Sequence, residues 1–126
     1  MDVVLPRDAG ARPILVVEDD DDTVAALRML LEDEGYASIA APDVGRAIDA
    51  LEREDPGLVL LDWSLDDGSG EAVLSAARLR TAAHTPVVLM TGSTGLKARG
   101  RGADAILRKP FDIGELLRIV ARYYRP

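Results

Sequence analysis

Residues 57–65 have the sequence Gly-Leu-Val-Leu-Leu-Asp-Trp-Ser-Leu, a short apolar run that stops at a carboxylate. Residues 58–61 follow a Pro-Gly pair, and a continuous apolar run of this kind is typical of a strand buried on both faces of a parallel sheet. Asp62 would then lie at the carboxyl end of a central strand, where open α/β sheets bind their ligands. Residues 66–71 continue as a loop and the start of a helix.

Similar apolar runs and intervening helical patterns extend over the rest of the chain. Further strands are predicted at residues 14–17, 37–41, 86–90 and 105–107. Apolar residues at helical spacing predict helices that begin near Val24, Val44, Ala72 and Ile113. The first of these helices should end at Gly35. The last begins with a capping-box pattern formed by Asp112 and Glu115. Alternating strands and helices predict an α/β fold, a five-stranded parallel sheet that is doubly wound, with helices on both faces.

Length and composition narrow the class of protein. The 126 residues suit one domain, which we place at residues 13–126 after a mobile leader at residues 1–12. The chain has no cysteine, no apolar run of membrane-spanning length and no signal sequence, so we expect a cytoplasmic protein with no membrane contact. A net charge of −7 and scattered arginines argue against nucleic acid as a partner.

The residues that follow the predicted strands carry chemical groups that complement one another. Glu18 and Asp19 follow the first strand, Asp62 the third, Thr91 the fourth, and Lys109 lies beyond the fifth. Parallel strands bring these ends to one edge, where three carboxylates would repel one another and raise one another's pKa. A divalent cation removes that repulsion, and an oxygen-only ligand set favours Mg²⁺ over zinc or copper.

The same edge could bind a phosphoryl group. Lys109 would add an ammonium and Thr91 a hydroxyl beside Asp62, which would be the nucleophile and form an acyl phosphate. Simpler interpretations remain for single residues. Asp20, Asp21 and Asp22 are interpreted as helix-dipole stabilisers, and for Glu18 and Asp19 this role and the metal-ligand role both stay open. Trp63 is interpreted as a packing residue, and His84 receives no role.

Four motifs together resemble the receiver domain of two-component response regulators, over roughly residues 13–124. They are Ile-Leu-Val-Val-Glu-Asp at 14–19, Leu-Val-Leu-Leu-Asp at 58–62, Pro-Val-Val-Leu-Met-Thr-Gly at 86–92 and Lys-Pro-Phe at 109–111. The resemblance implies a CheY-like sheet of flavodoxin-like strand order. It also implies a protein that is a phosphoacceptor, assisting its own phosphorylation and dephosphorylation, rather than an enzyme.

The resemblance further implies roles for individual residues. Asp62 would take a phosphoryl group from a phosphohistidine on a sensor histidine kinase or a histidine phosphotransfer protein, and the domain would then signal to an output protein whose identity is unknown. Asp19, Asp62 and the backbone carbonyl of Ser64 would bind Mg²⁺, with Glu18 acting mostly through water. Thr91 and Lys109 would contact the phosphoryl oxygens. The Lys109–Pro110 peptide bond is expected to be cis.

Three features depart from the family pattern. Asp66 replaces the proline that usually lies four residues after the phosphoacceptor, and Ile106 replaces the switch aromatic residue. The segment from Thr91 to Lys109 is about one helical turn short and rich in glycine, so the helix expected there should be short, irregular or absent. Dimerisation through that face is therefore in doubt.

Two other functions remain as alternatives. A hydrolase of phosphate esters could also use an aspartyl nucleophile, but such enzymes usually have a second acid two residues on, where this chain has Ser64. A pseudo-receiver that only binds proteins is the other alternative, and the complete set of site residues argues against it. A flavin site is disfavoured because the loop after the first strand is acidic.

Overall fold

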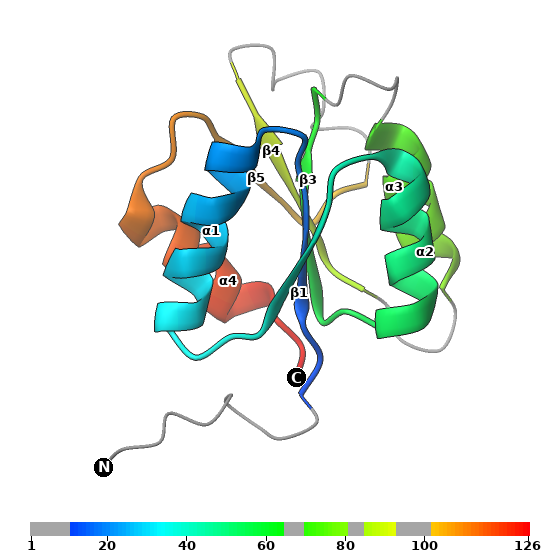
Figure 1. Ribbon diagram of the computed structural model, residues 1–126, viewed down its shortest axis with the longest axis horizontal. Helices are drawn as coiled ribbons and strands as arrows, with labels where there is room; N and C mark the ends of the chain where they lie inside the picture. Colours follow the sequence, from blue (N-terminus) through cyan, green and yellow to red (C-terminus); the bar gives the residue numbers. More distant parts are fainter. Residues whose placement is uncertain (1–10, 65–69, 81–84, 93–101) are drawn as a thin grey trace.

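The computed structural model describes residues 11–64, 70–80, 85–92 and 102–126, and it has one parallel sheet between two layers of helices (Figure 1). The strands lie in the order β2-β1-β3-β4-β5, and all pairs are parallel. The elements in chain order are β1 (Ile14–Val17), α1 (Asp21–Asp33), β2 (Ser38–Ala41), α2 (Val44–Glu54), β3 (Leu58–Asp62), α3 (Gly70–Leu79), β4 (Val87–Thr91), β5 (Ala105–Arg108) and α4 (Ile113–Tyr123). The predicted doubly wound fold is confirmed.

The sheet is buried on both faces because its central strands are apolar at every position. Alternate side chains of β1 and β3 point to opposite faces, as the pleat requires. Leu15 and Leu61 pack with α2 and α3, whereas Val16 and Leu60 pack with α1 and α4. Figure 1 shows these two helix pairs on opposite sides of the sheet. The continuous apolar runs in the sequence therefore correspond to a two-sided core.

The helix ends follow the local signals in the sequence. Asp20 is the N-cap of α1 and its side chain accepts from the Thr23 N–H, while Asp112 caps α4 by accepting from the Glu115 N–H, which confirms the predicted cap. Gly35 has φ 88° just beyond α1, a left-handed conformation that favours glycine. These caps fix the direction in which each helix leaves the sheet.

Several predictions fall on residues that the structure does not describe, namely the helix between Thr91 and Lys109, the loop at Asp66, and residues 1–10 of the leader. Residue 12 of the leader is described, and the Arg12 side chain donates to the carbonyl oxygen of Asp55 at 3.2 Å. The Lys109–Pro110 peptide bond is cis, as predicted. Within the described residues, no helix is long and apolar enough to cross a membrane.

The two ends of the described chain meet at the edge of the sheet where the strands begin, at the bottom of Figure 1. The Gly57 N–H donates to the Pro13 carbonyl at 2.9 Å, and the Arg125 N–H donates to the Gly57 carbonyl at 3.0 Å. A Cβ at Gly57 would lie 2.1 Å from the Arg125 carbonyl oxygen and 2.9 Å from the Tyr124 ring. Glycine is therefore required here by the close approach of the last residues.

We predict that Gly57→Ala destabilises the fold by about 1–3 kcal/mol, because the added methyl group displaces Arg125 and breaks its hydrogen bond to Gly57. Urea unfolding followed by circular dichroism measures this as a lower midpoint at unchanged slope. Gly45→Ala in α2 is the matched control, since a Cβ there meets only Asp43 at 3.6 Å. An unchanged midpoint for Gly57→Ala would show that the carboxyl-terminal contact adds nothing to stability.

Candidate functional site

Parallel pairing brings the polar strand ends together at one edge of the sheet, the top of Figure 1. Val17 pairs with Leu61, and Thr91 pairs with Arg108, so the residues that follow β1 and β5 lie level with the ends of β3 and β4. Asp62 itself pairs with Met90. The site is thus held by rigid strands on a buried core, with each functional group at or just beyond a strand end.

Lys109 joins the outer strand to the acidic residues. Its Nζ lies 2.8 Å from Oε1 of Glu18 and 3.3 Å from Oδ1 of Asp62. Its backbone N–H donates to the Thr91 carbonyl at 2.7 Å. The other carboxylate oxygen of Glu18 accepts from the Asp19 N–H at 3.0 Å and the Asp20 N–H at 3.3 Å. The Lys109 ammonium therefore forms ion pairs with two buried carboxylates, those of Glu18 and Asp62.

Burial and charge shift the protonation of these groups. Burial, followed by the hydrogen bond to Asp62, raises the pKa of Glu18 to about 7, although Lys109 acts in the opposite direction. Burial would also raise the pKa of Asp62, but hydrogen bonds from Glu18 and Ser64 and the charge of Lys109 outweigh it, so that pKa lies below its usual value. Burial works against the charge of Lys109, but its two carboxylate partners raise its pKa overall. Asp62 is thus held ionised beside a cation, which suits a nucleophile.

The carboxylates form a ligand set that fits a hard divalent cation. Glu18, Asp19 and Asp62 each offer one oxygen, and these oxygens all lie within 4.8 Å of one another. Glu18 and Asp62 are each 2% exposed, whereas Asp19 is more open to solvent. One ammonium, that of Lys109, lies against two of these three carboxylates, Glu18 and Asp62. Oxygen ligands with excess negative charge favour Mg²⁺ or Ca²⁺ over softer metals.

Ser64 makes a contact with Asp62 that the sequence analysis missed. Its backbone N–H lies 3.1 Å from Asp62 Oδ1, and its hydroxyl donates to the same oxygen at 2.9 Å. The resemblance had implied that the Ser64 carbonyl binds Mg²⁺ and that Ser64 flanks the phosphoryl group, but not that Ser64 donates two hydrogen bonds to Asp62. A serine two residues after an aspartate at a strand end is a local signal for such a turn, in which the aspartate accepts from the residue two positions on.

The remaining predicted residues lie beside this cluster. Thr91 ends β4 and is 2% exposed, next to the strand that carries Asp62. Trp63 is partly buried and packs against the core on the α2 and α3 side, as does Ile106. The Trp63 N–H donates to the Met90 carbonyl at 2.9 Å, which holds the end of β3 against β4. The packing interpretation of Trp63 is therefore confirmed.

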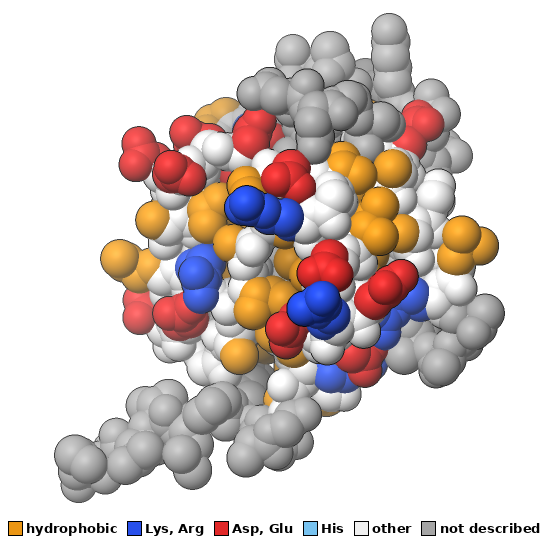
Figure 2. Space-filling model, turned by 45° about the vertical axis from the view of Figure 1, so that its right-hand side comes forward, with side chains coloured by type: hydrophobic (Ala, Val, Ile, Leu, Met, Phe, Trp, Pro, Cys, Tyr) orange, Lys and Arg blue, Asp and Glu red, His pale blue; other side chains and the backbone are white. Residues whose placement is uncertain are grey.

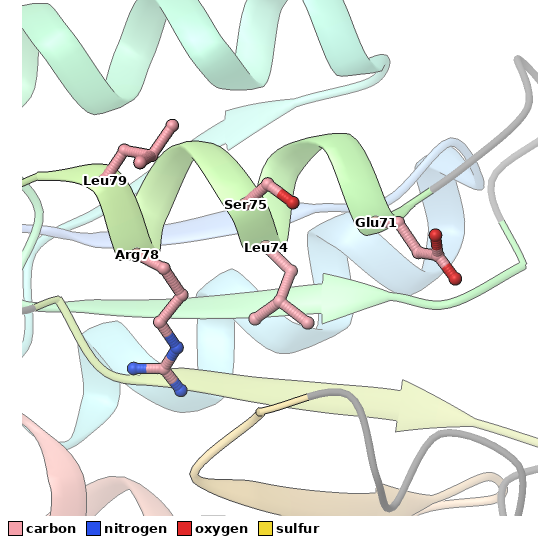
Figure 3. Close-up of a pocket in the computed structure, with 5 residues that line it drawn as sticks. All are labelled: Glu71, Leu74, Ser75, Arg78 and Leu79. Atoms are coloured by element: carbon pink, nitrogen blue, oxygen red, sulfur yellow. The ribbon is translucent and has the colours of Figure 1, made fainter.

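A hollow of about 510 Å³ lies on α3, away from the acidic cluster. It is lined by Glu71, Leu74, Ser75, Arg78 and Leu79 (Figure 3). No side chain of the acidic cluster lines it, so this hollow and the acidic cluster lie at different places. On the face drawn in Figure 2, basic and acidic side chains are interspersed rather than segregated into a basic stripe.

Comparisons with known proteins agree with this geometry. Residues 14–121 match the family described as response regulator receiver domain. The phosphate regulon transcriptional regulatory protein PhoB of Escherichia coli is 37% identical over 112 residues, which are 85% of this chain and 49% of that protein. This chain therefore spans about half the length of that relative.

Solved structures show the same fold. The receiver domain of NtrX from Brucella abortus is 31% identical, with a TM-score of 0.80 over 87% of this chain and 96% of that one. The receiver domain of sensor histidine kinase PA1611 from Pseudomonas aeruginosa has a TM-score of 0.81 at 24% identity, covers 90% of this chain and 98% of that one, and is described with magnesium in its active-site cleft. Family match, relatives and fold agree, and this chain belongs to the receiver domains of two-component response regulators.

Proposed function

We propose that Asp62 accepts a phosphoryl group from a phosphohistidine on a sensor histidine kinase or a histidine phosphotransfer protein. The observation that supports this most directly is the ionised, buried Asp62 carboxylate, which lies 3.3 Å from the Lys109 ammonium and within the acidic cluster. An oxygen of Asp62 attacks phosphorus, the bond from phosphorus to the histidine nitrogen breaks, and the imidazole keeps the bonding pair. Lys109 and the Thr91 hydroxyl bind the phosphoryl oxygens during the transfer.

The acidic residues would hold Mg²⁺ in this reaction. Asp19, Asp62 and the Ser64 carbonyl are the proposed ligands, and Glu18 acts through water. When bound, the ion supplies positive charge that neutralises the carboxylates and the phosphoryl oxygens. The clustering of the three carboxylates supports this proposal, and so does the magnesium described in the PA1611 receiver cleft.

Phosphorylation would change the balance of charge that holds the edge together. It adds up to about two negative charges at Asp62, and Lys109 is the nearest described cation. Lys109 must then divide its hydrogen bonds between the phosphoryl oxygens and Glu18. This redistribution is the proposed start of the conformational signal, and the receiving protein is a partner that recognises the changed edge. The domain consumes one phosphoryl group per signal and is not an enzyme with substrate turnover.

We predict that the protein gains the mass of one phosphoryl group when incubated with Mg²⁺ and acetyl phosphate, and that Asp62→Asn abolishes the gain. An amide at this position cannot form the acyl phosphate. Asp49→Asn on the exposed side of α2 is the matched control and should gain the group like the wild type, since Asp49 lies away from the acidic cluster and forms an ion pair with Arg53 at 3.1 Å. Intact-mass spectrometry measures all three proteins.

The other outcomes distinguish the alternatives. A wild type that gains no mass would favour a pseudo-receiver that only binds proteins. Sustained release of phosphate from varied esters would favour a hydrolase. Gain of the group by Asp62→Asn would place the phosphoacceptor at another residue.

We predict that Asp19→Asn weakens Mg²⁺ binding by about tenfold or more, because loss even of an indirect metal contact has an effect of this size. Asp21→Asn is the control, since it removes the same charge from the same acidic segment but lies in the first turn of α1. The single tryptophan, Trp63, follows Asp62 directly, so its fluorescence can report metal binding. Equal effects of the two substitutions would show that general charge, rather than coordination by Asp19, attracts the ion.

A further inference from the structure

The carboxylate of Asp104 fixes the start of β5, the strand that leads to Lys109. β5 is the outer strand of the described sheet and pairs with β4. The Asp104 N–H donates to the Val87 carbonyl at 2.9 Å, and the Val87 N–H donates back to the Asp104 carboxylate at 2.8 Å. These two reciprocal hydrogen bonds join β4 and β5 at the point where β5 begins.

Arg78 holds the same point from the neighbouring helix. In a regular parallel ladder, the Val87 N–H would donate to the backbone carbonyl two residues before Asp104, which is that of Gly102. The chain turns at Gly102, where φ is 90°, and the Gly102 carbonyl instead accepts from the Arg78 side chain. Arg78 also lies 3.1 Å from the Asp104 carboxylate, and Figure 3 shows its side chain extending from α3 toward the strands. The Asp104 side chain thus replaces a backbone acceptor that the turn removes from the ladder.

We propose that Asp104, held by Arg78, is a positioning residue for phosphoryl transfer, because it sets where β5 places the Lys109 ammonium. This inference rests on the proposed phosphorylation of Asp62. It adds a residue at the opposite edge of the sheet, which contacts neither the phosphoryl group nor the metal and acts only through Lys109.

The shortness of β5 explains how a contact at its start can matter at its end. The strand covers Ala105–Arg108, and Lys109 follows directly. Ala105 and Leu107 pack toward α1 and α4, whereas Ile106 packs toward α2 and α3. A shift of one residue would exchange these faces and move Lys109 by about 3.3 Å along the edge. Much smaller shifts also matter, since about 1 Å of misplacement can slow a reaction roughly a hundredfold.

The first test compares rates of phosphorylation. Asp104→Ala removes the acceptor, and Asp104→Asn keeps an oxygen that can accept from the Val87 N–H. Asp55→Ala is the matched control, because it removes a carboxylate that pairs with Arg12 and Arg80 but lies at the end of α2. Each protein is incubated with Mg²⁺ and acetyl phosphate and followed by intact mass. We expect Asp104→Ala to gain the phosphoryl group about three- to tenfold more slowly, which corresponds to misplacement by a fraction of an ångström. Asp104→Asn and Asp55→Ala should react like the wild type.

A second measurement distinguishes positioning from general damage to the site. The Lys109 ammonium lies against two carboxylates of the proposed metal site, Glu18 and Asp62, and repels a cation bound there. With Lys109 displaced, Mg²⁺ should bind about two- to fivefold more tightly to Asp104→Ala, as measured by Trp63 fluorescence. General damage would instead weaken Mg²⁺ binding and slow phosphorylation together. Lys109→Ala should also bind Mg²⁺ more tightly, and adding Asp104→Ala to it should have no further effect.

Arg78→Ala is a milder variant that leaves the two bonds between Asp104 and Val87 in place. It should show slower phosphorylation and tighter Mg²⁺ binding, each to a smaller extent than Asp104→Ala. Urea unfolding followed by circular dichroism checks that every variant is folded. If Asp104→Ala does not fold, an Arg78→Ala protein with both properties unchanged overturns the proposal.

Other results also overturn it. An unchanged phosphorylation rate for Asp104→Ala, or an equal loss in Asp55→Ala, would show that Asp104 has no particular role in the transfer. Weaker Mg²⁺ binding by Asp104→Ala, or an effect on Mg²⁺ affinity that persists in Lys109→Ala, would show that it does not act through Lys109. These results leave the proposed function intact as long as the wild type gains the phosphoryl group. A wild type that gains none overturns the proposed function and this inference with it.

Discussion

The sharing of one ammonium between two buried carboxylates is the interaction on which the functional edge depends. Glu18 and Asp62 are both 2% exposed, and Lys109 lies within 3.3 Å of an oxygen of each. Burial, followed by the hydrogen bond to Asp62, raises the pKa of Glu18 to about 7, and the opposing effect of Lys109 does not outweigh them. The fold tolerates this because backbone N–H groups of Asp19 and Asp20 also donate to Glu18. Buried carboxylates are unfavourable unless positive charge lies beside them. Lys109 supplies part of that charge in the protein itself, and a bound divalent cation would supply more.

Much of this arrangement could be predicted from the sequence because two strong signals coincide. Buried strands of a parallel sheet require apolar residues at every position, so residues 14–17 and 58–61 are evident without an alignment. Parallel pairing then places the residue after each run at a known edge, and this is why Glu18, Asp62 and Lys109 could be expected to meet. Residue spacing could not predict the cis peptide bond at Lys109–Pro110, which was expected from the resemblance to receiver domains.

Other contacts could not be predicted because they depend on tertiary approach. Nothing in the sequence pairs Gly57 with Arg125, whose carbonyl lies where a Cβ would be, and nothing pairs the ring of Tyr36 with that of Tyr124, 5.0 Å away at an interplanar angle of 73°. The hydroxyl of Ser64 was missed for a different reason. A serine hydroxyl in a loop can form hydrogen bonds with several nearby groups, and only the structure shows that the Ser64 hydroxyl donates to Asp62 Oδ1.

The two edges of the sheet differ in how their polar groups are satisfied, and this difference bears on how a signal could spread. At the edge where the strands begin, polar groups form hydrogen bonds with other protein groups at fixed positions. For example, the Asp104 carboxylate accepts from the Val87 N–H at 2.8 Å and from the Arg78 side chain at 3.1 Å. This contact ties the start of β5 to β4 and α3. Where the strands end, Lys109 divides its interactions between carboxylates, and its bonds can be redistributed when charge is added. Because the start of β5 is fixed, added charge at Asp62 should not shift the whole strand. The structural change should instead be confined to the edge where the strands end, around Lys109 and the residues that lead into α4.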